Sequence, residues 1–406
     1  MKVLHVMTHF PWPPNNGARA DIWARLLAMK ELGYSVHALI TAQKTPPDAR
    51  DMAEAKKLVD RIDFVDRRSA WKCLVSYEPT NISRNRPLAE FPLTEPYDLT
   101  IMEAEDTFPI CENPTLKSTL RVIRIHNDEV NYLWEFARHE ESFVRKQFVR
   151  MEALRMIPYS KAAHRGVDSL WFISQDERQR FISKNPSMAE KAVWLPPSIE
   201  LRGEVPKLAA AQNKRVLFVG NFYTTLNRDG LRWYLKYVHP ELMKDPNYEF
   251  IVVGSTQDRP ASYSFVEEIK KEQRCTVHAD LRDTSPMYQE CAVFVNPMRS
   301  GAGVKLKSIH AIEAGIPVVS TSIGNEGNGF MDREHIRVAD TPEDFASAIT
   351  ELLASPELRR DLAARAYNNL TTQYNSAKNI DRLVTGSLSR RAPFSRDEHA
   401  ALSTSK

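Results

Sequence analysis

Residues 292–330, AVFVNPMRSGAGVKLKSIHAIEAGIPVVSTSIGNEGNGF, decide the fold of this chain. They predict a short apolar strand over 292–295, a turn containing Gly301 and Gly303, one helix, and a second apolar strand over 316–320. Strand, glycine loop, helix and strand make one βαβ unit. Because the crossover in such units is right-handed, we expect the loop at the carboxyl ends of the strands, where α/β proteins bind ligands.

The same glycine loop predicts a site for an anion. Gly301 and Gly303 let a ligand approach the backbone closely, and the first N–H groups of the following helix attract negative charge. Lys305 and Lys307 stand in the first turn of that helix, where the macrodipole disfavours cations. An anionic ligand would offset this cost, whereas the alternative is an ordinary helix start exposed to solvent.

The composition limits the class of protein. A chain of 406 residues is longer than a single core usually supports, so two domains are expected. The net charge of +3 gives no argument for a nucleic-acid partner, and four scattered cysteines without metal-ligand spacing fit a reducing compartment. The start MKVLHVMTHF does not read as a signal peptide, and no apolar run is as long as a transmembrane helix. We therefore expect a soluble, cytoplasmic protein.

Strands and helices alternate through both halves of the chain. The predicted strands are residues 3–7, 36–41, 62–65, 99–102, 121–125, 169–173, 193–195, 215–219, 249–253, 276–278, 293–295, 318–320 and 336–338. The predicted helices are residues 18–32, most of 127–163, 228–242, 265–273, 285–290 and 342–388. This alternation predicts an α/β protein with parallel sheets that are covered by helices on both faces.

Two such series predict two doubly wound, Rossmann-like domains that face each other across a cleft, with the active site between them. A polar stretch with prolines, PPSIELRGEVPKLAAAQN, separates the two series. The predicted parts are an N-terminal domain over residues 1–200, a linker over 201–213, a C-terminal domain over 214–372, a further helix over 373–388 and a disordered tail over 389–406.

Several of these pieces carry a resemblance to a known family. FVGNFYTTLNRDGLRWYLKYVHPEL, FIVVGS and PMRSGAGVKLK with AGIPVVSTSIGNEG are similar to the donor-binding domain of retaining glycosyltransferases of the GT-B fold, in family 4 (glycosyl transferases group 1). LHVMTHFPWPPNNGARADIW and IHNDEVNYLWEFAR resemble the acceptor-binding domain of that family. The resemblance implies that the helix over 373–388 crosses back to the first domain.

The resemblance also implies a reaction. Such an enzyme transfers a sugar from a nucleotide-diphosphate-sugar donor to a glycan or lipid-linked acceptor with retention, in polysaccharide or glycoconjugate biosynthesis. It uses no metal and no cofactor, because cations of the protein stabilise the leaving diphosphate as the bond to C1 breaks. In this sequence Lys307 matches the phosphate-contacting lysine, and Arg228 matches the second phosphate contact, with an exposed helix-start arginine as the alternative. We expect Asn227 to be the N-cap of that helix.

Further residues are expected on the donor side. Gly17 is expected to close on the diphosphate from the first domain, although an ordinary turn explains it equally well. The remaining donor-binding predictions are Asn221, Arg299, Gly301, Gly303, Lys305, His310, Glu313 and Glu326.

His126 follows an apolar strand and begins the sequence HNDE. A lone histidine is usually structural, but its place at a strand end and its match to the family motif imply a catalytic role, as a hydrogen bond to the transferred sugar. Asn127 and Glu129 are expected beside it on the acceptor side. The leaving phosphate, rather than His126, is expected to accept the proton of the incoming hydroxyl. Glu129 is the alternative base, and Asp128 or Glu129 has the alternative role of capping a helix.

One pair of family glutamates is not intact in this chain. His310 stands where a glutamate accepts hydrogen bonds from the nucleotide ribose, and residues 299–302 contain no carboxylate. A neutral imidazole has one acceptor nitrogen, so losing a bond would weaken donor binding by about 1–3 kcal/mol. Glu313, three residues on, could compensate. The change at His310 makes a non-catalytic homologue that acts as a partner subunit one alternative. The other alternative is a nucleotide-sugar epimerase of the same fold, but that class uses carboxylates against a bound sugar, so the missing carboxylates argue against it.

The stretch RHEESFVRKQFVRMEALRM, residues 138–156, interleaves basic and apolar side chains. Acceptor domains of the family often work at a membrane, and a basic amphipathic helix suits peripheral contact with the inner face. The favoured alternative is a helix whose apolar residues are buried and whose basic back is solvated. Its apolar residues are Phe143, Phe148, Met151 and Leu154.

Overall fold

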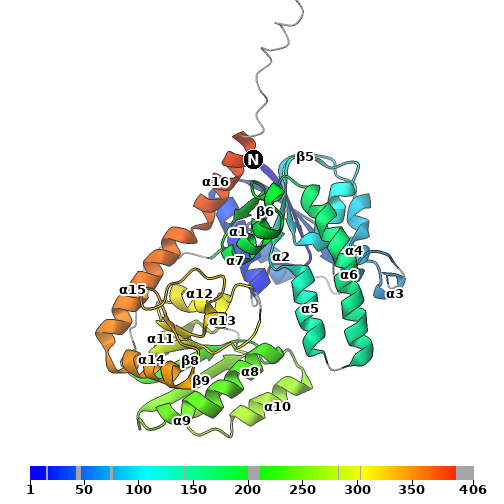
Figure 1. Cartoon of the computed structure of the whole chain (residues 1–406). Coiled ribbons are helices and arrows are strands. Elements are labelled where there is room, and N and C mark those ends of the chain that lie inside the picture. Colours follow the sequence, from blue (N-terminus) through cyan, green and yellow to red (C-terminus); the bar gives the residue numbers. More distant parts are fainter. Residues whose placement is uncertain are drawn as a thin grey trace, which may run out of the picture. The chain divides into compact units, whose positions relative to one another are not determined.

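The computed structural model describes residues 1–14, 17–42, 47–73, 76–140, 142–199, 211–281, 283–301 and 303–389. These residues form two compact units, shown with their elements in Figure 1. The first unit comprises Met1–Phe172, Phe181–Ile199 and the helix that begins at Ser376. The second comprises Ile173–Arg180 and the described residues from 211 to Asn375.

A seven-stranded parallel sheet forms the centre of the first unit, in the order β3-β2-β1-β4-β5-β6-β7. Its strands are β1 (Lys2–Met7), β2 (Ser35–Ala42), β3 (Arg61–Asp66), β4 (Pro96–Glu103), β5 (Lys117–Ile125), β6 (Ser169–Phe172) and β7 (Ala192–Trp194). The chain proceeds from β1 outward to β3 and then returns to β4 on the other side of β1. This reversal is the switch point at which doubly wound sheets bind ligands.

Both faces of this sheet are covered. Val3 and Met7 of β1 belong to one buried cluster, and Leu4 and Val6 belong to another, as the alternation of a strand requires. The helices of this unit are α1 (Gly17–Glu31), α2 (Ala49–Ala55), α3 (Ala70–Cys73), α4 (Thr80–Arg84), α5 (Glu129–His139), α6 (Phe143–Arg165) and α16 (Ser376–Ser389), with 3-10 turns at Arg86–Glu90, Glu105–Glu112 and Pro186–Met188.

A six-stranded parallel sheet forms the second unit, in the order β10-β9-β8-β11-β12-β13. Its strands are β8 (Lys214–Val219), β9 (Tyr248–Gly254), β10 (Cys275–Ala279), β11 (Val293–Asn296), β12 (Val318–Ser320) and β13 (Arg337–Val338). The switch point of this sheet lies between β8 and β11. The predicted βαβ unit is therefore confirmed as β11, a helix and β12.

The helices of the second unit are α8 (Thr225–Trp233), which continues through a π-helical turn (Tyr234–Val238) into α9 (His239–Leu242), and then α10 (Pro260–Ile269), α11 (Ser285–Glu290), α12 (Leu306–Glu313), α13 (Ser322–Asn325), α14 (Pro342–Ala354) and α15 (Pro356–Gln373). A large apolar cluster joins the sheet to α8, α9, α10, α14 and α15. Helix α7 (Gln175–Lys184) begins in the second unit and ends in the first.

The structure corrects some local predictions. Thr224, not Asn227, is the N-cap of α8, so Arg228 is the fourth residue of the helix rather than its opening residue. The predicted linker falls largely on residues 200–210, and the predicted tail falls almost wholly on residues beyond 389, which are outside the described residues. None of the helices within the described ranges combines the length and the apolar character needed to span a bilayer.

Candidate active site

The switch point of the second unit brings together three side chains that were named from the sequence, Asn221, Asn227 and Lys307. Lys307, the second residue of α12, donates a hydrogen bond from Nζ to Asn227 Oδ1 at 2.5 Å. Asn227 in turn donates from Nδ2 to the backbone oxygen of Asn221 at 2.9 Å and to its Oδ1 at 3.0 Å. The starts of α8 and α12 are thereby tied together, and we call Asn221, Asn227 and Lys307 the lysine cluster.

The lysine cluster holds a cation with neutral partners. Lys307 Nζ also lies 4.8 Å from the centre of the Phe218 ring. Burial disfavours the ammonium and nearby Lys305 repels it, so the pKa of Lys307 falls to about 7. A bound anion would favour the charged ammonium, which is the electrostatic property expected of a diphosphate site.

The loop before α12 has the geometry predicted for it. Gly301 and Gly303 have φ values of +119° and +77°, which favour glycine. A Cβ on Gly301 would come within 3.2 Å of Leu226 Cδ1, so the loop lies against the start of α8. Neither Lys305 at the N-cap of α12 nor Thr224 at that of α8 makes a side-chain cap, which leaves both helix starts open to an anion.

Three other predicted cations of this unit have different surroundings. Lys305 is buried and donates to the Gly303 carbonyl at 2.5 Å, and burial lowers its pKa although Glu326 and Glu177 partly oppose this. Arg228 is half-buried and donates to Thr225 Oγ1 at 3.3 Å, while its Nε has no hydrogen-bond partner among the described residues.

Arg299, the third of these cations, is exposed. It stacks over the Trp233 ring at 4.9 Å and donates to the Asp340 carbonyl at 3.0 Å. These contacts tie it to α8 and to the segment after β13, so its assignment to the donor site stays a prediction.

His310 and Glu313 form a pair on one face of α12. His310 Nδ1 lies 3.2 Å from Glu313 Oε2. Because an ionised carboxylate only accepts, Nδ1 is the protonated nitrogen of a neutral His310, and Nε2 is left as an acceptor. The two side chains predicted to share the ribose-binding role are therefore adjacent, and Glu313 acts on the orientation of His310.

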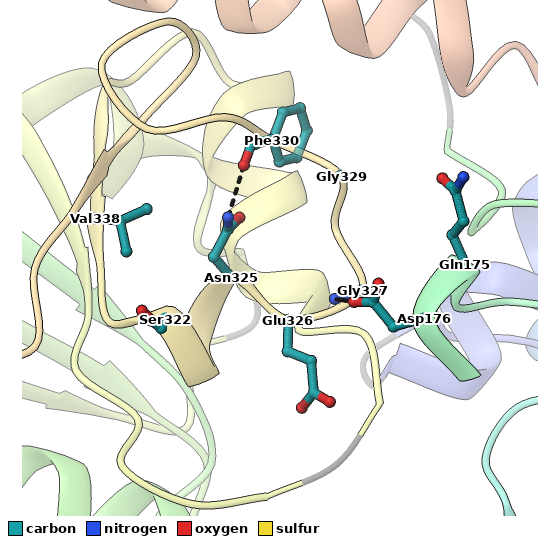
Figure 2. A pocket seen from close by; sticks show the side chains of 9 residues that line it. All are labelled: Gln175, Asp176, Ser322, Asn325, Glu326, Gly327, Gly329, Phe330 and Val338. Atoms are coloured by element: carbon teal, nitrogen blue, oxygen red, sulfur yellow. Dashed lines mark hydrogen bonds between the residues drawn. The ribbon is translucent and has the colours of Figure 1, made fainter. Parts of the chain in front are cut away.

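A cavity of about 350 Å³ lies beside the end of β12. Its lining includes Glu326, Gly327 and, from α7, Asp176. Figure 2 shows the Asp176 side chain directed at Gly327, whose N–H donates to Asp176 Oδ2 at 3.0 Å. Glu326 Oε1 accepts from Arg180 at 3.1 Å. The predicted donor-side residue Glu326 thus lines a cavity in the second unit.

The first unit places His126 at the end of β5, beside a carboxylate that the sequence analysis missed. His126 Nε2 lies 2.7 Å from Glu103 Oε2, at the end of the neighbouring strand β4. Glu103 Oε1 lies 2.5 Å from Arg25 Nη2 and 2.5 Å from His5 Nε2. Glu103 is buried, and His126 is about one-fifth exposed.

A second carboxylate completes this buried network. Asp21 accepts from Arg25 at 2.8 Å, from Arg124 at 3.2 Å and from the N–H of Ser198 at 2.6 Å. We call Asp21, Arg25, Glu103 and Arg124 the ionic network. Charged residues inside apolar elements are rarely buried unless paired, so RVIRI at β5 and the Asp21–Arg25 spacing on α1 were the signals that could have revealed it.

The charges of the ionic network are fixed by their partners. Burial alone would raise the pKa of Glu103, but the Arg25 guanidinium and hydrogen bonds from His126 and His5 hold it well below its usual range. Burial likewise opposes ionisation of Asp21, but Arg124 and Arg25 lower its pKa to about 2. Oxygen and nitrogen atoms of Asp21, Glu103 and His126 lie within 4.8 Å of one another. Because both carboxylates already hold arginines, this set is an ion-pair network rather than a good metal site.

The acceptor-side predictions lie just after His126. Asp128 is the N-cap of α5 and accepts from the N–H of Asn131 at 3.0 Å, so the capping alternative holds for Asp128. Glu129 begins α5, and burial together with Glu105, Asp106 and Asp128 raises its pKa to about 8. A carboxyl with that pKa is mostly protonated at neutral pH, and the alternative role of Glu129 as a base stays a prediction. Asn127 is half-buried, and Gly17 is the first residue of α1.

Comparison with known proteins identifies the family. Residues 213–355 match the family described as glycosyl transferases group 1. The chain is 30% identical over 392 residues to an uncharacterized 44.6 kDa protein in the cps region of Klebsiella pneumoniae, covering 93% of this chain and 97% of that protein.

Solved structures show the same fold. TarM of S. aureus has a TM-score of 0.68 at 12% identity, covering 95% of this chain and 100% of that one. Sucrose-phosphate synthase from Thermosynechococcus elongatus has a TM-score of 0.67 at 15% identity, covering 96% and 99%. HepE of Anabaena, in complex with UDP and glucose, has a TM-score of 0.64 at 13% identity, covering 96% and 100%. The chain therefore has the GT-B fold and belongs to the group 1 glycosyltransferases.

Proposed function

We propose that this glycosyltransferase moves a sugar from a nucleotide-diphosphate-sugar donor to a glycan or lipid-linked acceptor with retention of configuration, as family 4 enzymes do. The proposed setting is polysaccharide or glycoconjugate biosynthesis, supported by the relative in the cps region of Klebsiella pneumoniae. HepE in complex with UDP and glucose, and TarM in complex with UDP and alpha-GlcNAc-glycerol, support a nucleotide sugar as donor.

The observation that carries this proposal is the lysine cluster at the switch point of the second unit. A partly buried lysine with a lowered pKa, two uncapped helix starts and a loop with two glycines at positive φ meet there. Each of these features favours a bound anion. A diphosphate that becomes more negative as its bond to the sugar breaks is stabilised most at that moment, which is the requirement for catalysis.

In this mechanism the residues of the chain act on charge and position. Lys307, assisted by Arg228 and the N–H groups of α12, stabilises the leaving diphosphate, and the diphosphate accepts the proton of the incoming hydroxyl. His126 makes a hydrogen bond to the transferred sugar and does not act as a base. The cations of the protein take the place of a metal ion, so the assay below is run in the presence of EDTA.

One alternative has a specific observation in its favour, and the other has one against it. A non-catalytic homologue is favoured by His310 in the position of a ribose-binding glutamate, although its pairing with Glu313 leaves one acceptor nitrogen for a ribose hydroxyl. A nucleotide-sugar epimerase of the same fold needs carboxylates against the bound sugar, and Glu103 is already held by Arg25, His5 and His126.

The test is incubation of the protein with radiolabelled UDP-, GDP- and dTDP-sugars in EDTA. Release of nucleotide together with a labelled glycoside supports a transferase, and NMR of the product's anomeric coupling constant decides between retention and inversion. Interconversion of donor sugars supports the epimerase. Binding of nucleotide without turnover in the presence of lipid-linked and free glycan acceptors supports the non-catalytic homologue.

We also propose that α6 contacts the surface of an anionic membrane. The structure corrects the expected burial, because Phe143, Met151 and Leu154 are exposed, while the buried face of α6 is formed by other residues. Phe143, Arg150, Met151 and Leu154 repeat at helical spacing along one exposed stripe. Apolar side chains beside basic ones fit the boundary between acyl chains and anionic headgroups.

A further inference from the structure

Among the described residues, the partners of the Glu103 carboxylate are all nitrogen atoms. Oε1 faces Arg25 Nη2 and His5 Nε2, and Oε2 faces His126 Nε2 at 2.7 Å. The bond between Glu103 and His126 joins the ends of the adjacent strands β4 and β5, so the backbone holds both side chains in place.

This contact determines which nitrogen of His126 carries the proton. The guanidinium and the two imidazoles hold Glu103 ionised, and an ionised carboxylate accepts hydrogen bonds but donates none. The Nε2 atom of His126 therefore carries a hydrogen. In the neutral imidazole, the remaining nitrogen, Nδ1, is then a lone-pair acceptor.

We propose that Glu103 is a positioning residue that holds His126 as its Nε2–H tautomer and so presents Nδ1 to accept a hydrogen bond from a hydroxyl of the transferred sugar. The sugar contact rests on the proposed function; the tautomer rests on the geometry of β4 and β5 alone. The partly exposed His126 side chain is open to a ligand, whereas Glu103 and its partner Arg25 are buried.

Other charged groups also act on His126. Asp21 on α1, Asp106 on the 3-10 turn after β4 and His9 after β1 interact with it electrostatically. Glu103 is the group that makes a hydrogen bond to the ring, so it selects the nitrogen that keeps the proton.

The substitution Glu103→Gln should reverse the tautomer. The amide of Gln has one accepting oxygen and one donating NH₂ group. Two donors, Arg25 and His5, face the Oε1 position, so the amide oxygen is expected there. The NH₂ group then faces His126 Nε2, which must accept, and the proton of a neutral His126 moves to Nδ1. A similar exchange of carboxylate for amide puts the histidine of serine proteases in the wrong tautomer.

The experiment is NMR of the full chain labelled with ¹⁵N-histidine, using long-range ¹H–¹⁵N correlations that distinguish the two ring nitrogens. His126 is assigned by comparison with the His126→Gln variant. We expect Nε2–H in the unmodified protein and Nδ1–H in Glu103→Gln. The matched control is Glu105→Gln, because Glu105 pairs with His164 at 3.0 Å in the same unit. That variant should change the His164 signals and leave the His126 pattern unchanged.

Kinetics then test the link to the sugar. In Glu103→Gln we expect kcat/KM to fall about tenfold to a hundredfold, because one hydrogen bond to the sugar is lost, while UDP affinity changes less than twofold. An unmodified protein with Nδ1–H, or a variant with an unchanged tautomer, overturns the positioning role. A reversed tautomer with unchanged kcat/KM overturns the sugar contact. A chain without transferase activity overturns the proposed function, and the NMR result still decides the tautomer, even if Glu103→Gln fails to fold.

Discussion

At the scale of single residues, the candidate site depends on small changes of charge state. Lys307 is a side chain whose ordinary pKa of about 10.4 would keep it charged at every physiological pH. Burial and Lys305 move that pKa to about 7, so its charge depends on whether an anion is present. The sequence placed Lys307 in the first turn of a helix, but its hydrogen bond to Asn227 depends on a contact across 80 positions.

The affinity of the unmodified protein for UDP should therefore fall as pH rises above 7. An anion binds the protonated form of Lys307, and the free protein loses that proton near pH 7, whereas the complex keeps it to higher pH. Titration calorimetry from pH 6 to 9 measures the change, which approaches tenfold per pH unit in the steepest region. Lys307→Met should bind weakly with a flat profile, and Lys270→Met, at the exposed C-cap of α10, should behave like the unmodified protein.

A flat profile in the unmodified protein would remove Lys307 from the nucleotide site.

The lowered pKa of Lys307 also makes the stability of the folded protein depend on pH. The folded pKa of Lys307 lies below the unfolded one, so the unfolded chain binds the extra proton between about pH 7 and 10, and this group contributes increasing stability as pH rises through that range.

The pairing of His310 with Glu313 changes the nucleotide affinity that we expect when His310 is replaced by glutamate. A carboxylate at position 310 accepts from two ribose hydroxyls, but it would stand beside the Glu313 carboxylate at i,i+3, where like charges repel. We expect the double variant His310→Glu with Glu313→Gln to bind UDP about fivefold more tightly, for one further hydrogen bond of ~1 kcal/mol. The single variant His310→Glu should gain less, and calorimetry of both with UDP, GDP and dTDP measures the difference. Equal affinities in all three proteins would place the ribose elsewhere.

At the scale of secondary structure, the strands were predictable and some helices were not. Buried parallel strands are runs of Val, Ile and Leu, and each predicted strand coincides with an observed one to within a few residues. Helices α3 and α4 have four and five residues, too few for a helical period to emerge. The cap of α8 was placed three residues late, because Asn227 has a side chain suited to capping but uses it on Lys307 and Asn221.

Helix α6 shows how the pattern of apolar residues along a helix can predict the wrong buried face. It contains two sets of apolar residues, and periodicity alone does not say which set meets the sheet. Val149, Ala153 and Met156 are buried, while Phe143 and Val144 are about three-quarters exposed. Figure 1 shows α5 and α6 side by side, with the turn between them at one end of the pair. An exposed apolar pair next to that turn needs a partner or a membrane to cover it.

We therefore expect Phe143→Ser with Val144→Ser to reduce binding to vesicles of phosphatidylcholine mixed with anionic phosphatidylglycerol. The loss should be at least about tenfold, because burying each of these side chains contributes about 1.5–3 kcal/mol. Vesicle flotation measures it, and added salt should weaken binding through Lys146 and Arg150. The control is Tyr237→Ser with Met331→Ser, two exposed apolar residues of the second unit. Equal flotation of all three proteins would remove α6 from the membrane.

At the scale of the whole molecule, the path of the chain through its two units was the feature that was hardest to predict from the sequence. Alternating strands and helices predicted both sheets, and the switch points follow from the strand orders. The ionic network joins β4, β5 and α1, and His5 adds β1 through its contact with Glu103. This convergence is set by the order of the strands in the sheet rather than by any local motif. Local sequence patterns also do not indicate that Ile173–Arg180 belongs to the second unit, although the residues on either side of it belong to the first.

The last helix belongs to the first unit, although it follows the whole of the second. Ile380 and Val384 of α16 are buried in the cluster that contains Leu26 and Met29 of α1, and the two helices lie side by side in Figure 1. The chain leaves the second unit after Asn375, and the hydroxyl of Ser376 accepts a hydrogen bond from the N–H of Ile199. The core of the first unit is therefore closed by residues from both ends of the sequence.

Shortening Ile380 should destabilise the first unit and leave the second one intact. Ile380 has no exposed surface, so Ile380→Ala leaves a cavity between α16 and α1, and we expect a loss of about 2–4 kcal/mol in the free energy of unfolding. Hydrogen exchange with mass spectrometry resolves the two units: amides of β1, β4 and α1 should exchange faster, while those of β8, β11 and α12 keep their protection. Arg382→Ala, on the exposed side of the same helix, is the matched control and should change neither unit. Unchanged protection of β1 in Ile380→Ala would mean that α16 is dispensable to the first unit, whereas equal loss in both sheets would mean that the two units unfold as one.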